Sequence, residues 1–208
     1  MPRKPDAQLE GRILDAAYRL WSAGGEEALT MRAVAEAAGT TTPTVYERFR
    51  DKGEILNSLR QRAQQKLFAC VERANTLPDF CECFFEFALG HKNEYKLIHA
   101  DWGVRLSKDD PRPSFDLLKK RLAERLGGEP EQQARLALAL AALAHGTATI
   151  LLPEGVHWRV NRELRAICAD AWESLVAHAS KGPLGSKSAP GLKGRKGRPD
   201  AAHLQASI

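Results

Sequence analysis

The stretch "GTTTPTVYERFRDKGE", residues 39–54, decides the fold because it places three threonines and a proline between two segments with helical character. Threonine is a mediocre helix former, and proline breaks the interior of a helix. Nevertheless, Val45, Tyr46 and Phe49 recur with helical spacing directly after the proline. The stretch therefore contains either a loop or a short helix with a sharply defined start.

Pro43 favours the short helix. At the first or second helical position proline costs nothing, because the N–H that it lacks would have no partner there. Proline also pushes the preceding residue out of the α conformation, which suits an N-cap. We therefore predict a helix that ends near Phe49, with Thr42 as its cap and Thr41 as the alternative.

Helices are also predicted on both sides of this stretch. An apolar stripe predicts a first helix over residues 7–23, ended by two glycines. Thr30 is a good cap for a second, short helix, which Gly39 stops. Asp51 and Glu54 have the spacing of a capping box at the start of a long fourth helix.

Two short helices joined by a glycine turn and braced by a first helix form a helix-turn-helix unit, whose second helix enters the DNA major groove. Val45 and Phe49 would anchor that helix, and Thr41, Thr42 and Thr44 would face outward. Threonine can bond to phosphates or bases. Spacing alone leaves an ordinary helical corner as an equal alternative.

The segment "LTMRAVAEAAGTTTPTVYERFRDKGEIL", residues 29–56, resembles the DNA-binding signature of the TetR family of bacterial transcriptional regulators. That signature has a Thr-capped helix, an Ala-rich "IA..AGVS" segment and then "GTLYxYFxSKEEL". The resemblance covers roughly residues 8–60. Thr40, Pro43 and Glu47 depart from the pattern, and we expect the operator preference to lie there.

The resemblance implies a role for individual residues of the helix-turn-helix unit. It implies that Tyr46 and Lys52 contact phosphates and that Thr30 and Arg32 approach the DNA backbone. It also implies that the threonines face the groove. The predicted DNA-binding residues are Thr30, Arg32, Thr41, Thr42, Thr44, Tyr46 and Lys52.

The remainder of the chain also reads as helices, so the predicted fold class is all-α. We predict a helix-turn-helix domain over residues 7–55 and a helical regulatory domain over residues 56–180. The predicted helices of this second domain cover 80–91, 93–102, 114–126, 131–152 and 160–179. By the resemblance, this domain binds a ligand and dimerises, and the last two helices form the interface between two copies.

An apolar pocket among these helices is the expected site for an unknown small-molecule effector. Its predicted polar or aromatic lining is Tyr95, His99, Trp102 and His145. Each of these has a purely structural alternative, such as a helix packing contact. A metal site of His99, Asp101 and His145 is a further alternative, but the prediction is that the chain holds no metal and no cofactor.

Composition and charge bear on the compartment and on the tail. The chain has 208 residues, 43% of them hydrophobic, and a net charge of +5. No apolar run is expected to span a membrane, and residues 1–13 have no signal core, so a cytoplasmic protein is expected. The four cysteines are expected to be reduced thiols. The whole net charge lies in residues 181–208, because residues 1–180 sum to zero.

The composition of residues 181–208 predicts a disordered basic tail, rich in Gly, Pro, Ser and Lys. Its segment "KGRKGRP", residues 193–199, resembles an AT-hook, in which Lys196 replaces the first arginine. Basic arms of this kind can follow the DNA minor groove. The alternative is a charged tail that only aids solubility.

These features together predict a homodimeric regulator that binds double-stranded operator DNA, and a repressor whose ligand changes the spacing of its recognition helices. One alternative is a helix-turn-helix regulator without a small-molecule ligand. The other is an all-helical enzyme. The sequence contains no nucleophile elbow, P-loop, dinucleotide fingerprint or zinc motif, so the prediction is that the protein is not an enzyme.

Overall fold

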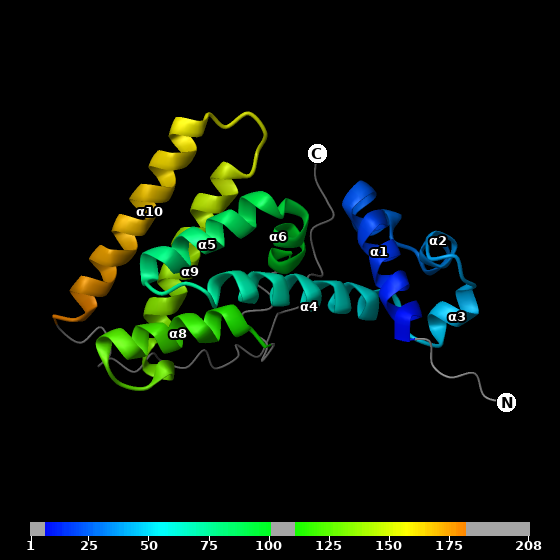
Figure 1. Ribbon diagram of the computed structural model, residues 1–208, viewed down its shortest axis with the longest axis horizontal. Coiled ribbons are helices and arrows are strands. Elements are labelled where there is room, and N and C mark those ends of the chain that lie inside the picture. The colour runs from blue at the N-terminus through cyan, green and yellow to red at the C-terminus, as the bar shows by residue number, and fades with distance from the viewer. Residues whose placement is uncertain (1–6, 101–110, 182–208) are drawn as a thin grey trace, which may run out of the picture.

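The computed structural model describes residues 7–100 and 111–181, which form helices and no strand (Figure 1). This confirms the predicted all-α class. The predicted tail beyond Lys181 lies outside the described residues. The helices are α1 (Ala7–Ala28), α2 (Met31–Ala37), α3 (Thr42–Tyr46), α4 (Lys52–Val71), α5 (Leu77–Gly90), α6 (Lys92–His99), α8 (Pro113–Leu126), the 3₁₀ helix η1 (Pro130–Gln133), α9 (Ala134–Leu151) and α10 (Trp158–Ala179).

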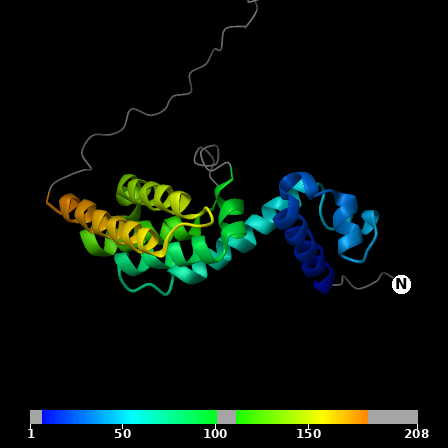
Figure 2. The same cartoon turned by 90° about the horizontal axis from the view of Figure 1, so that it is seen from above.

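Two hydrophobic cores organise these helices. The amino-terminal core gathers buried residues of α1 to α4, among them Ile13, Val34 and Val45. The carboxyl-terminal core gathers residues of α4, α5, α6, α8, α9 and α10 around the fully buried Trp172. Figure 2 shows α4 running from one group of helices to the other. The predicted boundary between residues 55 and 56 falls inside this continuous helix.

Capping fixes where the helices of the amino-terminal domain begin. Thr30 caps α2, since its Oγ1 accepts from the N–H of Ala33 at 3.1 Å. Asp51 caps α4, since its Oδ1 accepts from the N–H of Glu54 at 2.9 Å. Both caps were predicted from sequence and are confirmed. Glu54 does not close a capping box with Asp51, because its carboxylate accepts from the N–H of Arg50 at 2.6 Å.

The predicted cap of α3 was wrong by one residue. Thr41 is the cap, with extended backbone and an Oγ1 that accepts from the N–H of Thr44 at 3.4 Å. Thr42 is instead the first helical residue and Pro43 the second, where the missing N–H is still harmless. Thr42 therefore adopts helical backbone geometry, although the proline that follows it disfavours this conformation. The regular helix ends at Tyr46, earlier than predicted, although the N–H of Phe49 still bonds the Val45 carbonyl at 2.9 Å.

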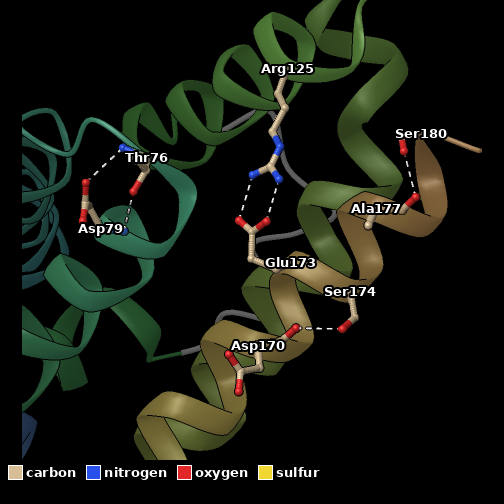
Figure 3. A network of polar contacts seen from close by, with 8 residues as sticks. All are labelled: Thr76, Asp79, Arg125, Asp170, Glu173, Ser174, Ala177 and Ser180. Atoms are coloured by element: carbon tan, nitrogen blue, oxygen red, sulfur yellow. Dashed lines mark hydrogen bonds and ion pairs between the residues drawn. The ribbon is translucent and has the colours of Figure 1, made fainter.

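Two other boundaries differ from the predictions. The backbone leaves helical geometry at Gly24 and Gly25, as predicted, but α1 then resumes and continues to Ala28. Helix α5 begins at Leu77, before the predicted start at residue 80, because Thr76 closes a capping box. Its Oγ1 accepts from the N–H of Asp79 at 3.2 Å, and the Asp79 carboxylate accepts from the Thr76 N–H at 3.1 Å (Figure 3).

Helix α10 is the element farthest from α2 and α3 (Figure 1). It is held to α8 by a bidentate ion pair, in which the Arg125 guanidinium donates to the two Glu173 carboxylate oxygens at 2.7 and 2.5 Å (Figure 3). It is held to α9 by a buried hydrogen bond of 3.1 Å from the Trp172 indole N–H to the Leu140 carbonyl. These contacts fix the relative position of the three carboxyl-terminal helices.

The stretch Pro130–Leu151, which comprises η1 and α9, is long and apolar enough by composition to cross a membrane. This differs from the expectation that no apolar run of the chain would be long enough to span a membrane. Its inner side packs in the carboxyl-terminal core through Leu136, Leu140 and Ala144. Core helices commonly have this composition, so one such helix is weak evidence for a membrane span.

The capping box of α5 supplies a test of the fold. Thr76→Ala should lower the free energy of unfolding by about 1 kcal/mol, because the N–H of Asp79 loses its acceptor. Urea denaturation followed by circular dichroism measures this. The control is Ser174→Ala on α10, whose hydroxyl only bonds back to the Asp170 carbonyl (Figure 3) and which should change stability by less than about 0.5 kcal/mol. Equal effects of the two substitutions would contradict the assignment.

Candidate DNA-binding interface and effector cavity

The turn between α2 and α3 depends on Gly39, whose φ of +66° lies in the left-handed region. The N–H of Thr40 bonds the Ala35 carbonyl at 2.9 Å, and the N–H of Gly39 bonds the Glu36 carbonyl at 3.1 Å. This is the arrangement of a helix end closed by glycine. Because a side chain at Gly39 would be strained, the turn fixes the direction in which α3 leaves α2.

Helix α3 is anchored by its apolar side and exposes the opposite side. Val45 is fully buried and Phe49 is 3% exposed, as predicted. Tyr46, the next residue after Val45, is 53% exposed, which is unusual for a large aromatic side chain. The ring is therefore available to a partner outside the chain.

The threonines of α3 are arranged around its first turn. Thr41 is exposed, and Thr42 and Thr44 are half-buried. The hydroxyls of Thr41 and Thr44 lie 2.9 Å apart and share a hydrogen bond. The cap therefore orients two of the three predicted groove-facing hydroxyls, while Thr42 is held by the backbone of the first turn.

The predicted backbone-contacting residues surround α3. Thr30 uses its hydroxyl as the cap of α2, and Arg32 is exposed in the first turn of that helix. Lys52, at the first position of α4, reaches back to the end of α1. Its Nζ lies 3.1 Å from the Glu26 carboxylate and 3.5 Å from the Glu26 carbonyl. Such a partly exposed ion pair contributes at most about 1 kcal/mol.

Arg50 was missed by the sequence analysis. It lies in the turn between α3 and α4, and its side chain is 86% exposed. Its Nε is 3.4 Å from the Asp51 carboxylate, at the cap of α4. The signal in the sequence was the alternation of Arg48, Arg50 and Lys52, which concentrates positive charge directly after α3.

A cavity of about 100 Å³ lies in the carboxyl-terminal core among six helices. Its wall is mostly apolar and aromatic, with four polar side chains. Of the four residues predicted to line it, His99 does so, Tyr95 and His145 do not, and Trp102 lies outside the described residues. The lining residues are Gln64, Leu67, Val71, Phe80, Phe84, Ile98, His99, Arg112, Pro113, Ser114, Phe115, Leu118, Ala141, Ala144 and Trp172.

Tyr95 and His145 join His99 in a stack of three rings. The centroid of the His99 ring is 4.2 Å from that of Tyr95 and 4.6 Å from that of His145. The Tyr95 hydroxyl makes a very short hydrogen bond with Nδ1 of His145, and Nδ1 of His99 donates to the Tyr95 carbonyl at 2.9 Å. The structure thus brings three of the four predicted residues together.

Burial sets the charge of this stack. It lowers the pKa of His99 to about 4, lowers the pKa of His145, and raises the pKa of Tyr95. The stack is therefore uncharged at neutral pH. The alternative metal site required His99, Asp101 and His145, but Asp101 lies outside the described residues. The two imidazole planes lie 19° apart in a stack, whereas ring nitrogens bind metals in the ring plane.

Most of the cavity wall was missed by the sequence analysis. Phe80 and Phe84, four residues apart on α5, form its aromatic side, together with Phe115 of α8. Arg112 brings a guanidinium to the wall, and its Cζ lies 5.1 Å from the centroid of the Phe115 ring. The spacing of Phe80 and Phe84 was the only signal of one common face.

The buried stack predicts an acid sensitivity. An unfolded His99 binds a proton with a pKa of 6.5, whereas the folded one stays neutral down to about 4. The free energy of unfolding should therefore fall as the pH drops from 6.5 towards 4, by up to about 1.4 kcal/mol per pH unit from His99.

Urea denaturation at several pH values measures this, with His99→Gln as the comparison. His145 titrates in both proteins, so the difference in slope isolates His99. The variant should lose less stability than the wild type over this range. Equal slopes would contradict the buried, neutral state of His99.

With this geometry in place, comparisons with known proteins are informative. Residues 13–59 match the sequence profile of bacterial regulatory proteins of the tetR family. A 63-residue segment, 30% of this chain, is 43% identical to the HTH-type transcriptional repressor KstR of Mycolicibacterium smegmatis. The match spans only 31% of the length of that repressor.

Solved structures resemble the whole described fold. A protein of unknown function from Rhodococcus sp. RHA1 superimposes with a TM-score of 0.65 and 21% identity, covering 85% of this chain and 100% of that one. A TetR-family transcriptional regulator from Streptomyces coelicolor superimposes with a TM-score of 0.60 and 24% identity. The match covers 82% of this chain and 98% of that one. A TetR variant from Acinetobacter baumannii AYE, in complex with minocycline, superimposes with a TM-score of 0.58 and 18% identity. The match covers 85% of this chain and 98% of that one.

The solved structures and the sequence matches point to the same kind of protein, the first through the fold and the second through the helix-turn-helix region. The structures, all below 25% identity, establish the fold, while the sequence matches concern the helix-turn-helix region described above. The helix-turn-helix region, residues 13–59, is therefore that of the tetR family of bacterial regulatory proteins, and the described fold resembles solved structures of that family.

Proposed function

We propose that this chain is a transcriptional regulator that binds operator DNA as a homodimer and represses the genes beside that operator. The observation that carries the proposal is the exposure of Tyr46 on a helix that Val45 and Phe49 anchor in the core. A short, rigidly held helix with one polar face is what the major groove accepts. The KstR repressor, which matches this region, supports the proposal.

In this proposal some of the predicted residues contact bases and the others contact phosphates. Thr41, Thr42 and Thr44 face the base edges, and Tyr46 reaches a phosphate with its hydroxyl. Lys52 exchanges the Glu26 carboxylate for a phosphate. Thr30 and Arg32, which precede α3 in the chain, and Arg50, which follows it, contact the DNA backbone. Phosphate contacts of this kind position the protein, whereas base contacts specify the sequence.

The homodimer is supported by apolar surface on α9 and α10. Among the described residues, seven of the eight large, exposed hydrophobic side chains lie on these two helices, and Ile150 is 60% exposed. Apolar surface of this extent is typical of an interface. The seven are Leu138, Leu143, Ile150, Trp158, Val160, Ile167 and Leu175. A second copy covering this surface would give the two recognition helices that successive major grooves require.

The cavity supports control by a small molecule. Gln64, Leu67 and Val71 of α4 line it, and the same helix contributes Ile55 and Leu59 to the amino-terminal core. A ligand that widened the cavity would move α4 and, with it, the recognition helix. Such a ligand acts only through its different affinity for the two conformations. The minocycline complex belongs to the Acinetobacter relative, and the effector of this chain is a separate question.

One observation favours a second candidate, a regulator without a small-molecule ligand. The cavity of about 100 Å³ is smaller than the roughly 300–1,000 Å³ of sites for drug-sized ligands. In that case the level of the protein, or a protein partner, would set the occupancy of the operator. In both cases we propose action in the cytoplasm, without enzymatic activity.

The recognition helix supplies the central test. Tyr46→Ala and Lys52→Ala should each weaken binding to the DNA upstream of the chain's own gene by about tenfold, because each removes a charged or polar contact to phosphate. For Lys52→Ala the dependence of log affinity on log salt should also fall by about one. Fluorescence anisotropy at several salt concentrations measures both effects.

Lys120→Ala is the matched control for this experiment, because Lys120 is exposed on α8 in the regulatory domain. It should leave both affinity and salt dependence unchanged. If the wild type does not bind this DNA in a salt-dependent way, or if all three variants bind alike, the proposed DNA interface is wrong.

The apolar surface predicts the oligomeric state. Ile150→Glu combined with Ile167→Glu should convert a dimer to a monomer, because the charges would be buried without partners. Light scattering after size-exclusion chromatography measures the mass. The control is Ala69→Glu on an exposed position of α4, which should remain dimeric. A wild-type monomer would contradict the proposal, as would a dimeric double variant.

A further inference from the structure

The four cysteines lie as two pairs, and each pair joins α5 to another helix. Cys81 and Cys168 are buried in the carboxyl-terminal core, with their sulfur atoms 3.9 Å apart. Cys70 of α4 and Cys83 of α5 are only half-buried. All four are free thiols. The second pair therefore differs from the first, because an ion from solution can reach it.

Glu86 completes a cluster with the half-buried pair. One ligand atom each from Cys70, Cys83 and Glu86 lies within 4.8 Å of the other two. Glu86 follows Cys83 by three residues, so both lie on the side of α5 that meets α4. The Cys70 thiol donates to the Cys83 carbonyl at 3.3 Å, which holds the two helices together at this point.

The cluster opens into a surface groove. Cys70 and Glu86 line this groove together with Lys66, Arg73 and His91. Lys66 is engaged by the Glu94 carboxylate at 2.8 Å, so part of its charge is balanced elsewhere. Arg73 acts against the binding of a cation, but it also favours the thiolate form of Cys83.

The chemistry of the three groups is that of a soft-metal site. Two thiols and one carboxylate, three groups that can each become an anion, have their ligand atoms within 4.8 Å of one another. A divalent cation would relieve this crowding. Two sulfur ligands and one carboxylate suit zinc and its heavier relative cadmium, whereas calcium and magnesium prefer oxygen alone.

We propose that Cys70, Cys83 and Glu86 form a binding site for a thiophilic divalent cation of the zinc type, which ties α4 to α5. Water would supply the remaining coordination, as at zinc sites with three protein ligands. Binding releases the thiol protons to solvent, and two sulfur–metal bonds replace them. This site is separate from the cavity, since none of its three residues lines that cavity.

The test uses the full-length, reduced protein and cadmium as the probe, because thiolate–cadmium bonds absorb in the ultraviolet. Titration should show one tight ion per chain, and zinc should displace it. Cys70→Ser and Cys83→Ser should each weaken binding by at least about tenfold, and Glu86→Gln should weaken it similarly. The double variant Cys81→Ala/Cys168→Ala should bind like the wild type.

Thermal unfolding gives a second readout. Cadmium should raise the Tm of the wild type and of Glu72→Gln, a control at the exposed carboxylate that directly follows α4. It should not raise the Tm of Cys70→Ser. Glu86 is exposed, so Glu86→Gln keeps the test decisive if a cysteine variant fails to fold. Absence of tight binding by the wild type would overturn the proposal, as would binding that depends on Cys81 and Cys168 instead.

Discussion

Helix α4 is the constraint on which the rest of the structure depends. Its buried residues recur every four positions as Ile55, Leu59, Ala63, Leu67 and Val71. In a helix of 3.6 residues per turn, each such step drifts by about 40°, so the stripe winds through about 160° from Ile55 to Val71. One continuous helix can therefore bury one side in the amino-terminal core and nearly the opposite side in the carboxyl-terminal core. Neither core is complete without it.

In the proposed function, the same helix is the physical link between ligand binding and DNA binding. A domain joined by a flexible linker would not feel a change in the other domain, whereas a shared rigid helix transmits any rotation. The cavity lies against the second half of α4, and the proposed metal site lies on the same half, at Cys70. A ligand in the cavity and a metal ion at Cys70 would thus both act on α4. Their effects on DNA affinity would be coupled even though their sites are distinct.

Some of this architecture could be read from the sequence, and the part that could was local. The caps Thr30 and Asp51 were predictable because a cap depends on residues three positions away. The predicted cap of α3 was wrong by one residue, since Thr41 and Thr42 are chemically identical neighbours that the local sequence does not distinguish. The cavity wall and the Cys70–Glu86 cluster could not be predicted, because each joins residues of different helices. His99 was found and Phe115 was not, since only polar residues stood out in an apolar region.

The contact between Lys52 and Glu26 gives the free protein an anion already bound where a phosphate is expected. In the proposed complex, the ion pair would partly hold the lysine side chain before DNA arrives, which would lower the side-chain entropy lost on binding. The carboxylate would have to be displaced, and it would then stand beside a polyanion that repels it. The pair would therefore compete with phosphate for Lys52 and favour correctly placed phosphates. Discrimination against non-specific DNA would then arise in part from an acidic residue at the end of α1, which touches no base.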